Sequence, residues 1–126
     1  MKGYIFRCND KTKDEAFQRV SLGEEQAYLP LVNQIEIDGV LFLYNTSTFE
    51  FSGIYNPSSE GREKIEADAW QGKFPSQIRF IEKDATKAIP FNKIEKIIKR
   101  YRHDIYPYME LSEEQVIKIM DVIKVS

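Results

Sequence analysis

The chain has 126 residues, of which 42% are hydrophobic, 30% charged and 13% aromatic, and this composition excludes a disordered or fibrous protein. Its 18 basic and 20 acidic residues leave a formal charge of −2, so attraction to a polyanion must come from a local basic patch. We therefore expect one compact domain over residues 1–126 with a conventional hydrophobic core.

The sequence also allows predictions about the cellular location of the protein and about its cofactors. The longest apolar run, residues 39–44, is too short to cross a bilayer, and no signal-peptide pattern opens the sequence. We expect an intracellular, cytoplasmic protein without membrane association. The single cysteine, Cys8, and the single histidine, His103, exclude an intrachain disulfide and a Cys/His zinc site, so we expect no metal or other cofactor.

The first predicted elements are a strand and a helix. Residues 3–8 are rich in β-branched and aromatic side chains and end at an Asn-Asp turn, which predicts a strand. Thr12 and Glu15 have the spacing of a capping box, and the apolar residues that follow predict a helix that ends at Gly23. We interpret residues 24–31 as a loop.

The middle of the chain predicts a hairpin and a long loop. Residues 40–44 are apolar throughout, which predicts a central strand covered on both faces. A polar turn follows this strand, and in residues 49–55 apolar residues or glycine alternate with mostly polar ones, which predicts the second strand of a hairpin. Residues 56–68 concentrate turn-forming side chains and predict a long exposed loop.

The C-terminal half predicts a further strand and two helices. Residues 77–81 alternate as a strand does, and the apolar positions in residues 91–101 have helical spacing. Residues 106–109 are interpreted as a short edge strand. Ser112 and Gln115 predict the capped start of a last amphipathic helix.

The strongest local charge lies between residues 87 and 103, where six basic residues and one acidic residue give a net charge of +5. A basic helix face beside tyrosines could hold phosphates while the rings stack on bases. The alternative is an ordinary solvated helix face. The candidate phosphate-binding residues are Lys73, Arg79, Lys93, Lys96, Lys99 and Arg100.

The single tryptophan, Trp70, lies between the predicted loop and the strand at residues 77–81. It could belong to the core, or it could line a concave site for a planar or cationic ligand. Catalysis has little support, because Cys8 would need His103 as its base, and no paired carboxylates or glycine-rich phosphate loop are present. We name no catalytic residue.

Four blocks of sequence, in this order, resemble the DCD (development and cell death) domain. They are residues 3–9 (GYIFRCN), residues 41–45 with 51–55 (LFLYN and FSGIY), residues 69–80 (AWQGKFPSQIRF) and residues 110–116 (ELSEEQV). Plant members of that family are linked to stress and cell-death responses. The same blocks are similar to the YTH and EVE domains of the PUA-like group.

This resemblance implies an α/β (α+β) domain, in which a PUA-like mixed sheet, curved or forming an open barrel, is flanked by about three helices. It also implies a non-catalytic domain that binds RNA, or DNA that is single-stranded or has a flipped base, and that could read modified bases. In YTH domains a Trp-x-Gly-Lys/Arg-Phe segment supplies one wall of an aromatic cage, and Trp70 to Phe74 is similar to it. The resemblance places a second wall near Tyr28 and base-edge contacts near Cys8 and Asn9.

Asn9 and Asn45 are candidates for amides that read the base edge, with Tyr44 and Phe74 beside them in the expected base site. Alternatively, Asn45 closes the hairpin and Asn9 forms an Asx turn. The alternative functions are a protein-interaction module, a targeting subunit for a separate enzyme, and a hydrolase such as some ASCH domains of the PUA-like group. The oligomeric state is left open.

Overall fold

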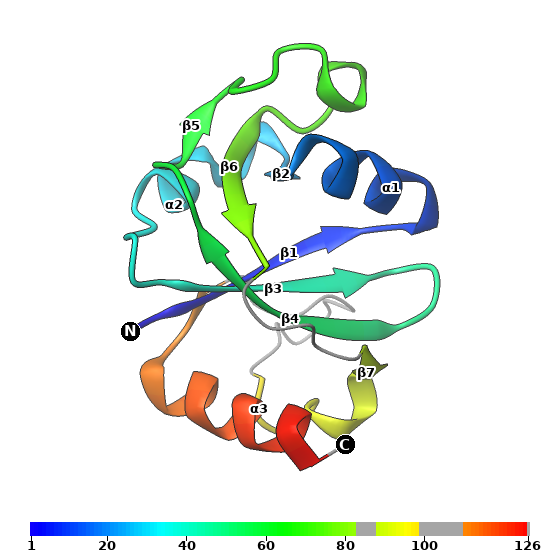
Figure 1. Cartoon of the computed structure of the whole chain (residues 1–126), viewed down its shortest axis with the longest axis vertical. Coiled ribbons are helices and arrows are strands. Elements are labelled where there is room, and N and C mark those ends of the chain that lie inside the picture. Colours follow the sequence, from blue (N-terminus) through cyan, green and yellow to red (C-terminus); the bar gives the residue numbers. More distant parts are fainter. Residues whose placement is uncertain (83–87, 99–109, 126) are drawn as a thin grey trace.

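The computed structural model of the chain describes residues 1–82, 88–98 and 110–125. Within them, eight strands form one mixed sheet in the order β2-β6-β4-β3-β1-β8, with β5 paired to β6 and β7 paired to β4 (Figure 1). The strands are β1 Gly3–Cys8, β2 Ser21–Glu24, β3 Val40–Asn45, β4 Glu50–Pro57, β5 Arg62–Glu63, β6 Ser76–Ile81, β7 Ile89–Pro90 and β8 Glu110–Leu111. The open, mixed sheet confirms the expected fold class.

Three α-helices cover the sheet in the described part of the chain. They are α1 Asp10–Arg19, α2 Leu29–Asn33 and α3 Glu113–Val125. Short 3-10 helices occur at η1 Gln26–Tyr28, η2 Ala69–Gly72 and η3 Phe91–Lys93. Helices α1 and α2 lie on one side of the sheet and α3 lies on the other (Figure 1).

Strand β3 occupies the middle of the sheet, and all six of its residues are buried, as the unbroken apolar run predicted. It pairs in parallel with β1 and antiparallel with β4. Because successive side chains of a strand point to opposite faces, Leu41 and Leu43 pack on the side of α1, whereas Phe42 and Tyr44 pack on the side of α3. The sheet therefore separates two cores.

The first core lies under α1 and α2, and the second lies under α3. Buried members of the first core include Phe6, Ala16, Leu22, Val32, Leu43, Trp70 and Ile78. Buried members of the second core include Ile5, Phe42, Phe51, Phe91, Ile94, Val116 and Ile119. The site that is described below lies at the margin of the first core.

Helix α1 begins three residues earlier than predicted. Its N-cap is Asn9, whose Oδ1 accepts a hydrogen bond from the backbone N–H of Thr12 at 2.8 Å, while Thr12 Oγ1 accepts from the N–H of Asn9 at 2.9 Å. This reciprocal pair is the actual capping box. The helix ends at Arg19, and not at Gly23, because its C-cap Val20 adopts a left-handed φ of 52°.

Two expected loops contain regular structure. The expected loop at residues 24–31 contains η1 and the start of α2, and β2 ends at its first residue, Glu24. Within residues 56–68, β4 continues to Pro57 and the short strand β5 follows. Tertiary pairing with β6 supplies the strand hydrogen bonds that the local sequence did not indicate.

The predicted helix at residues 91–101 is a 3-10 helix, η3, followed by turns in its described part. Its backbone bonds join residues three apart, such as the N–H of Ile94 to the carbonyl of Phe91 and the N–H of Ile97 to the carbonyl of Ile94. This geometry still buries Phe91, Ile94 and Ile98 in the second core. Residues 99–101 and the predicted strand at 106–109 lie outside the described residues.

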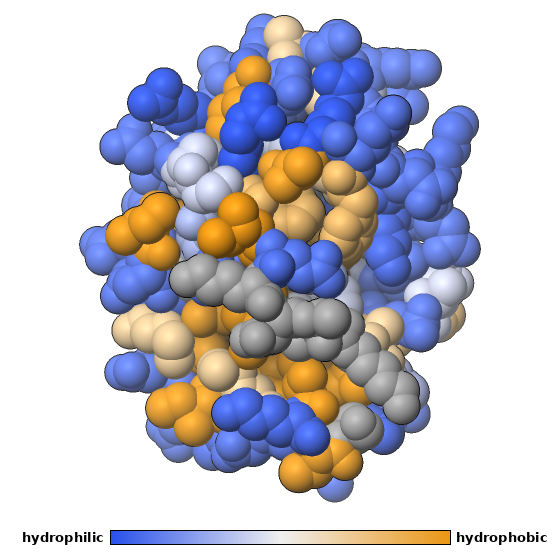
Figure 2. All heavy atoms as spheres, in the orientation of Figure 1, coloured by the Kyte–Doolittle hydropathy of each residue, from blue (hydrophilic) through white to orange (hydrophobic). Residues whose placement is uncertain are grey.

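The last helix begins as predicted. Ser112 Oγ accepts a hydrogen bond from the backbone N–H of Gln115, and Gln115 Oε1 accepts one from the N–H of Ser112. In the orientation of Figure 2, hydrophilic side chains cover most of the region around α1 and β5, and hydrophobic side chains gather nearer the middle of this face. No helix of the described ranges is long and apolar enough to span a membrane.

Candidate functional site

Trp70 is anchored to helix α1 by two hydrogen bonds. Its indole Nε1 donates to the carbonyl of Thr12 at 3.0 Å, and its backbone N–H donates to Glu15 Oε2 at 2.7 Å. The side chain is 6% exposed and belongs to the first core. Trp70 is therefore a packed residue that shows only a small part of its surface to solvent.

The backbone of this segment is left-handed at three successive residues. The φ angles are 51° at Trp70, 57° at Gln71 and 79° at Gly72. Glycine adopts this conformation readily, whereas each of the other two residues is disfavoured by about 1–2 kcal/mol. The contacts of the loop offset this cost, and strained residues of this kind often occur at functional sites.

Buried Gln77 of β6 holds the same loop from below. Its Nε2 donates to the carbonyls of Glu66 and Phe74 at 3.1 and 3.0 Å, and its Oε1 accepts from the N–H of Glu66 at 2.7 Å. Both amide N–H donors and the carbonyl oxygen of a side chain that is 1% exposed thus bind loop backbone. The loop has one defined position relative to the sheet.

A group of charged side chains ties the loop to the surface of α1. Arg19 lies 2.9 Å from Glu15, 3.1 Å from Asp68 and 3.6 Å from Glu66. The hydrogen bond from Arg19 lowers the pKa of the exposed Asp68 carboxyl below its ordinary value. Arg79, a candidate phosphate ligand, donates to the carbonyl of Arg19 at 3.2 Å and to Glu66 at 3.3 Å, so it is engaged in this group.

A hollow of about 210 Å³, here called the Trp70 hollow, lies between α1 and this loop. Its lining comprises Asn9, Lys11, Thr12, Glu15, Trp70, Gln71, Lys73 and Phe74. Phe74 is half-buried, and its ring meets the indole edge to face with centroids 5.8 Å apart. The amino groups of Lys11 and Lys73 are exposed and form no ion pair within the described residues.

A second hollow of about 180 Å³, here called the Cys8 hollow, adjoins the first and shares Asn9, Thr12 and Phe74 with it. Burial raises the pKa of its Cys8 thiol to about 12, which makes this thiol a poor nucleophile at neutral pH. Glu24, 3% exposed, accepts hydrogen bonds from Arg7 at 2.8–3.0 Å. These bonds raise the pKa of the Arg7 guanidinium above its ordinary value.

The two candidate asparagines have different surroundings. Asn9 uses its Oδ1 to cap α1, and its Nδ2 makes no hydrogen bond within the described ranges, so it can still donate at the rim of both hollows. Asn45 is 5% exposed, and both of its amide atoms are engaged, with Asp10 at 2.9 Å and the N–H of Ser47 at 2.8 Å. Asn45 thus shapes the turn after β3, in agreement with the alternative prediction that it closes the hairpin.

The structure does not bring all the predicted site residues together. Tyr44 lies in the second core, where its ring centroid is 4.7 Å from that of Phe91, on the other face of the sheet from Trp70. Tyr28 packs against the first core with the Arg7 guanidinium 5.1 Å from its ring centroid, but it lines neither hollow.

The predicted phosphate-binding residues are similarly divided. Lys73 borders the Trp70 hollow. Lys93 and Lys96 are exposed on the segment that packs into the second core, on the opposite side of the sheet. Lys99 and Arg100 lie outside the described residues. The described part of the basic segment that was expected to hold phosphates is therefore not part of the Trp70 site.

Sequence reasoning missed Lys11, Glu15 and the pair formed by Arg7 and Glu24. Lys11 and Glu15 are four residues apart on α1, so the helical period itself places them on one face beside Asn9. The Arg7 and Glu24 pair joins residues that are 17 apart through the approach of two strands, which no local pattern indicates. Within the described residues, no three His, Cys, Asp or Glu side chains are grouped so that they could hold a metal ion.

Comparison with protein families gives a match over nearly the whole chain. The family model described as Development and cell death domain matches residues 2–123. The chain is 32% identical over 127 aligned residues to the DCD domain-containing protein NRP of Arabidopsis thaliana. This alignment covers 95% of the chain and 36% of the plant protein, so the chain spans about a third of that relative.

Solved structures with a similar fold include YTH domains. The apo CPSF4-YTH domain of Toxoplasma has a TM-score of 0.73 at 12% identity, covering 98% of this chain and 86% of that one. The YTH domain of Zygosaccharomyces rouxii MRB1 protein, solved in complex with N6-methyladenosine RNA, has a TM-score of 0.70 at 10% identity, covering 98% and 86%. At these identities, the similarity establishes the shared fold.

Proposed function

This chain belongs to the development and cell death domain family, and we propose that it uses its YTH-like fold to bind single-stranded nucleic acid at the Trp70 hollow. The observation that carries the proposal is the pairing of an apolar wall, made by Phe74 and the edge of Trp70, with two exposed lysines at the rim that form no ion pair with any described residue. Nucleic-acid binding sites combine these two features, because bases have flat aromatic faces that stack on apolar rings whereas phosphates are anionic.

The size of the hollow fits one base better than a complete nucleotide. Pockets for drug-sized ligands measure about 300–1,000 Å³, and this one measures about 210 Å³. The base would lie against Phe74, a contact that contributes about 1–3 kcal/mol per base in proteins that bind single strands. The sugar and phosphates would then remain outside, within reach of Lys11 and Lys73.

Asn9 supplies the polar contact to the base. Because its Oδ1 is committed to the helix cap, the side chain can offer only its Nδ2 donor, which selects an acceptor on the base edge. Trp70 packs on Gly23, so the site presents one half-buried ring and an indole edge. This geometry favours a base-binding site with one aromatic wall. We further propose that the site recognises a methylated base.

The proposed role is binding without catalysis. Cys8, the nucleophile nearest to the hollow, is held as a thiol by its raised pKa. Catalysis at this site would also need a general base in contact with the nucleophile. The carboxylates that line the two hollows, such as Glu15 and Glu24, already bind other groups of the protein.

The test is a titration of fluorescently labelled oligomers of RNA and DNA, plain and with N6-methyladenine, at about 50 mM and about 200 mM salt. Lys11→Ala combined with Lys73→Ala should weaken binding about tenfold and reduce the salt slope by about 1.4, because each single-strand phosphate contact contributes about 0.7. Phe74→Leu should weaken binding while leaving the salt slope unchanged, because it removes stacking and no charge.

The matched control is Lys93→Ala combined with Lys96→Ala, which removes the same charge from the other side of the sheet and should leave affinity nearly unchanged. Equal losses in the two double variants would contradict the assignment of phosphates to the Trp70 hollow. If none of the oligomers binds, the proposal fails, and the protein-interaction alternative takes its place. A preference for the methylated oligomer would add base-modification reading to the proposed function.

A further inference from the structure

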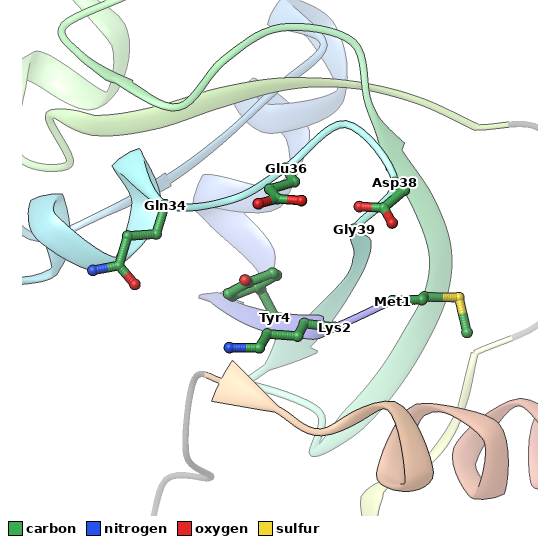
Figure 3. A pocket seen from close by; sticks show the side chains of 7 residues that line it. All are labelled: Met1, Lys2, Tyr4, Gln34, Glu36, Asp38 and Gly39. Carbon is green, nitrogen blue, oxygen red and sulfur yellow. The ribbon is translucent and has the colours of Figure 1, made fainter.

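A third, larger hollow lies at the other end of β1 from the Trp70 hollow. Its volume is about 560 Å³, and its lining comprises Met1, Lys2, Tyr4, Gln34, Glu36, Asp38 and Gly39 (Figure 3). Gln34 comes from the end of α2, and Glu36 and Asp38 come from the loop that leads into β3. None of these residues takes part in the proposed nucleic-acid site.

Tyr4 gives this hollow a polar atom that lacks a partner. The side chain is 3% exposed, and its hydroxyl makes no hydrogen bond within the part of the chain that the structure describes. Figure 3 shows the Tyr4 side chain facing the space between Gln34, Glu36 and Lys2. Buried hydroxyl groups in proteins are usually hydrogen-bonded, so this oxygen is available to a ligand that enters the hollow.

Two carboxylates, those of Glu36 and Asp38, and one side-chain amino group, that of Lys2, line the hollow beside this hydroxyl. Burial raises the pKa of Tyr4, and the carboxylates of Glu110, Glu36 and Asp38 raise it further. Glu36 and Asp38 form no ion pair within the described ranges, whereas Lys2 lies 4.0 Å from Glu110. A tight turn, closed by a 2.9 Å hydrogen bond from the N–H of Gly39 to the carbonyl of Glu36, keeps both unpaired carboxylates beside the hollow.

We propose that this hollow binds an alkylguanidinium group, the arginine side chain of a partner polypeptide, between Tyr4, Glu36 and Asp38. Guanidinium carries five N–H donors in a planar fork, enough to reach both carboxylates and the Tyr4 oxygen at once. Ile37, 71% exposed between the two acidic residues, offers an apolar contact for the aliphatic stem of the same side chain and for its neighbours in the peptide.

This site is separate from the proposed nucleic-acid site. Tyr4 and Asn9 are five residues apart along β1 and its C-terminal turn, about 16–17 Å at the rise of a strand. The charged side chains of the two sites also differ, since two lysines and Glu15 line the Trp70 hollow, whereas two carboxylates and Lys2 line this one. The peptide and the nucleic acid therefore have different contact residues, and loss of one binding activity does not imply loss of the other.

The experiment is a titration of the isotope-labelled protein with a short, otherwise uncharged peptide that contains one arginine, followed by two-dimensional NMR. The same peptide with citrulline in place of arginine keeps nearly the same shape, but it removes the charge and replaces one donor nitrogen with a carbonyl oxygen. Agmatine supplies the guanidinium without a peptide. The arginine peptide should produce saturable shifts of the Gly39 backbone and Gln34 side-chain signals. The citrulline peptide should bind about tenfold more weakly or not at all.

Three variants test the named residues. Glu36→Gln combined with Asp38→Asn should weaken arginine-peptide binding about tenfold or more, because it removes both charges from an exposed turn without removing volume. Tyr4→Phe should weaken binding about fivefold while keeping the packed ring. The matched control, Glu63→Gln combined with Asp121→Asn, makes the same charge change at exposed positions elsewhere and should bind as the parent does.

The absence of saturable shifts at Gly39 and Gln34 with the arginine peptide would overturn the proposal. Equal binding of the citrulline peptide, or equal weakening in the matched control, would show that charge at this hollow is not responsible and would also overturn it. Binding of agmatine together with no binding of the peptide would overturn the assignment to a polypeptide partner, because the hollow would then take a free small cation.

Discussion

Substitution of Gly23 by alanine tests the packing that holds Trp70 in place. Gly23 lies in β2 opposite Gln77, and its backbone is in a conformation open to any residue. A Cβ atom at this position would lie 2.5 Å from Cζ3 and 2.9 Å from Cη2 of Trp70. Since carbon atoms pack best at about 3.5–4.0 Å, the indole would have to move by about 1 Å.

The expected cost follows from this displacement. Overpacking of a core costs about 1–3 kcal/mol, and a weakened Nε1 hydrogen bond to Thr12 would add about 1 kcal/mol. The lower conformational freedom of alanine in the unfolded chain returns about 0.4–1 kcal/mol. We therefore expect Gly23→Ala to lower the free energy of unfolding by about 2 kcal/mol.

The assay is urea unfolding monitored by fluorescence, because Trp70 is the single tryptophan of the chain. The folded variant should emit at longer wavelength than the parent, since its indole is pushed from a 6% exposed position toward solvent. Gly72→Ala is the control, because a Cβ there meets nothing within 4 Å while its φ of 79° is strained. It should cost about 1 kcal/mol without a shift in emission.

A double-mutant cycle with Trp70→Phe isolates the contact, with unfolding followed by circular dichroism. Phenylalanine lacks the outer indole ring, so Gly23→Ala should cost at least about 1 kcal/mol less in that background than in the parent. If Gly23→Ala matches the parent in stability and emission, or if its cost is the same in both backgrounds, the indole does not lie over β2 as described. The account of the Trp70 hollow would then be wrong.

Two further predictions concern the Cys8 hollow. Glu24→Gln should lower the free energy of unfolding by about 3 kcal/mol in urea titrations, because it leaves Arg7 without its buried counter-charge. Glu25→Gln, at an exposed position 3.9 Å from Arg7, should change the free energy of unfolding by less than about 0.5 kcal/mol. Equal effects of the two substitutions would show that burial of the carboxylate does not matter here. Cys8 should react with a thiol reagent at neutral pH about 1,000-fold more slowly in the folded protein than in urea, because its pKa is about 12 and not 9.0; comparable rates would contradict its burial.

The elements that were predicted correctly are those whose signals are local. The apolar run of β3, the alternation in β4 and β6, and the capped amphipathic face of α3 each appear within a few residues of sequence. Strand β2 was missed because Ser21, Gly23 and Glu24 carry no strand signal of their own. It forms because β6 pairs with it and because buried Glu24 finds Arg7 as its partner.

The helix predicted at residues 91–101 shows the opposite error. Apolar spacing indicated which side chains face the core, and Phe91, Ile94 and Ile98 do so, but it did not determine the hydrogen bonds between them. An apolar face with this spacing can be buried by 3-10 turns that follow a strand as well as by an α-helix. The burial prediction was therefore more reliable than the prediction of the backbone geometry.

The sequence alone determined the family, the open mixed sheet and the two-sided burial of β3, because each of these rests on residue types in a fixed order along the chain. Only the tertiary structure decided which candidates meet. Strand alternation sends Tyr44 to one core and Trp70 to the other, the α1 cap engages Asn9, and the turn after β3 uses both amide atoms of Asn45. The tertiary structure also placed Lys11 and Lys73 around one hollow, and Tyr4 and Glu36 around another. Proximity between distant segments depends on how strands pair and helices pack, and the local sequence around each residue does not indicate it.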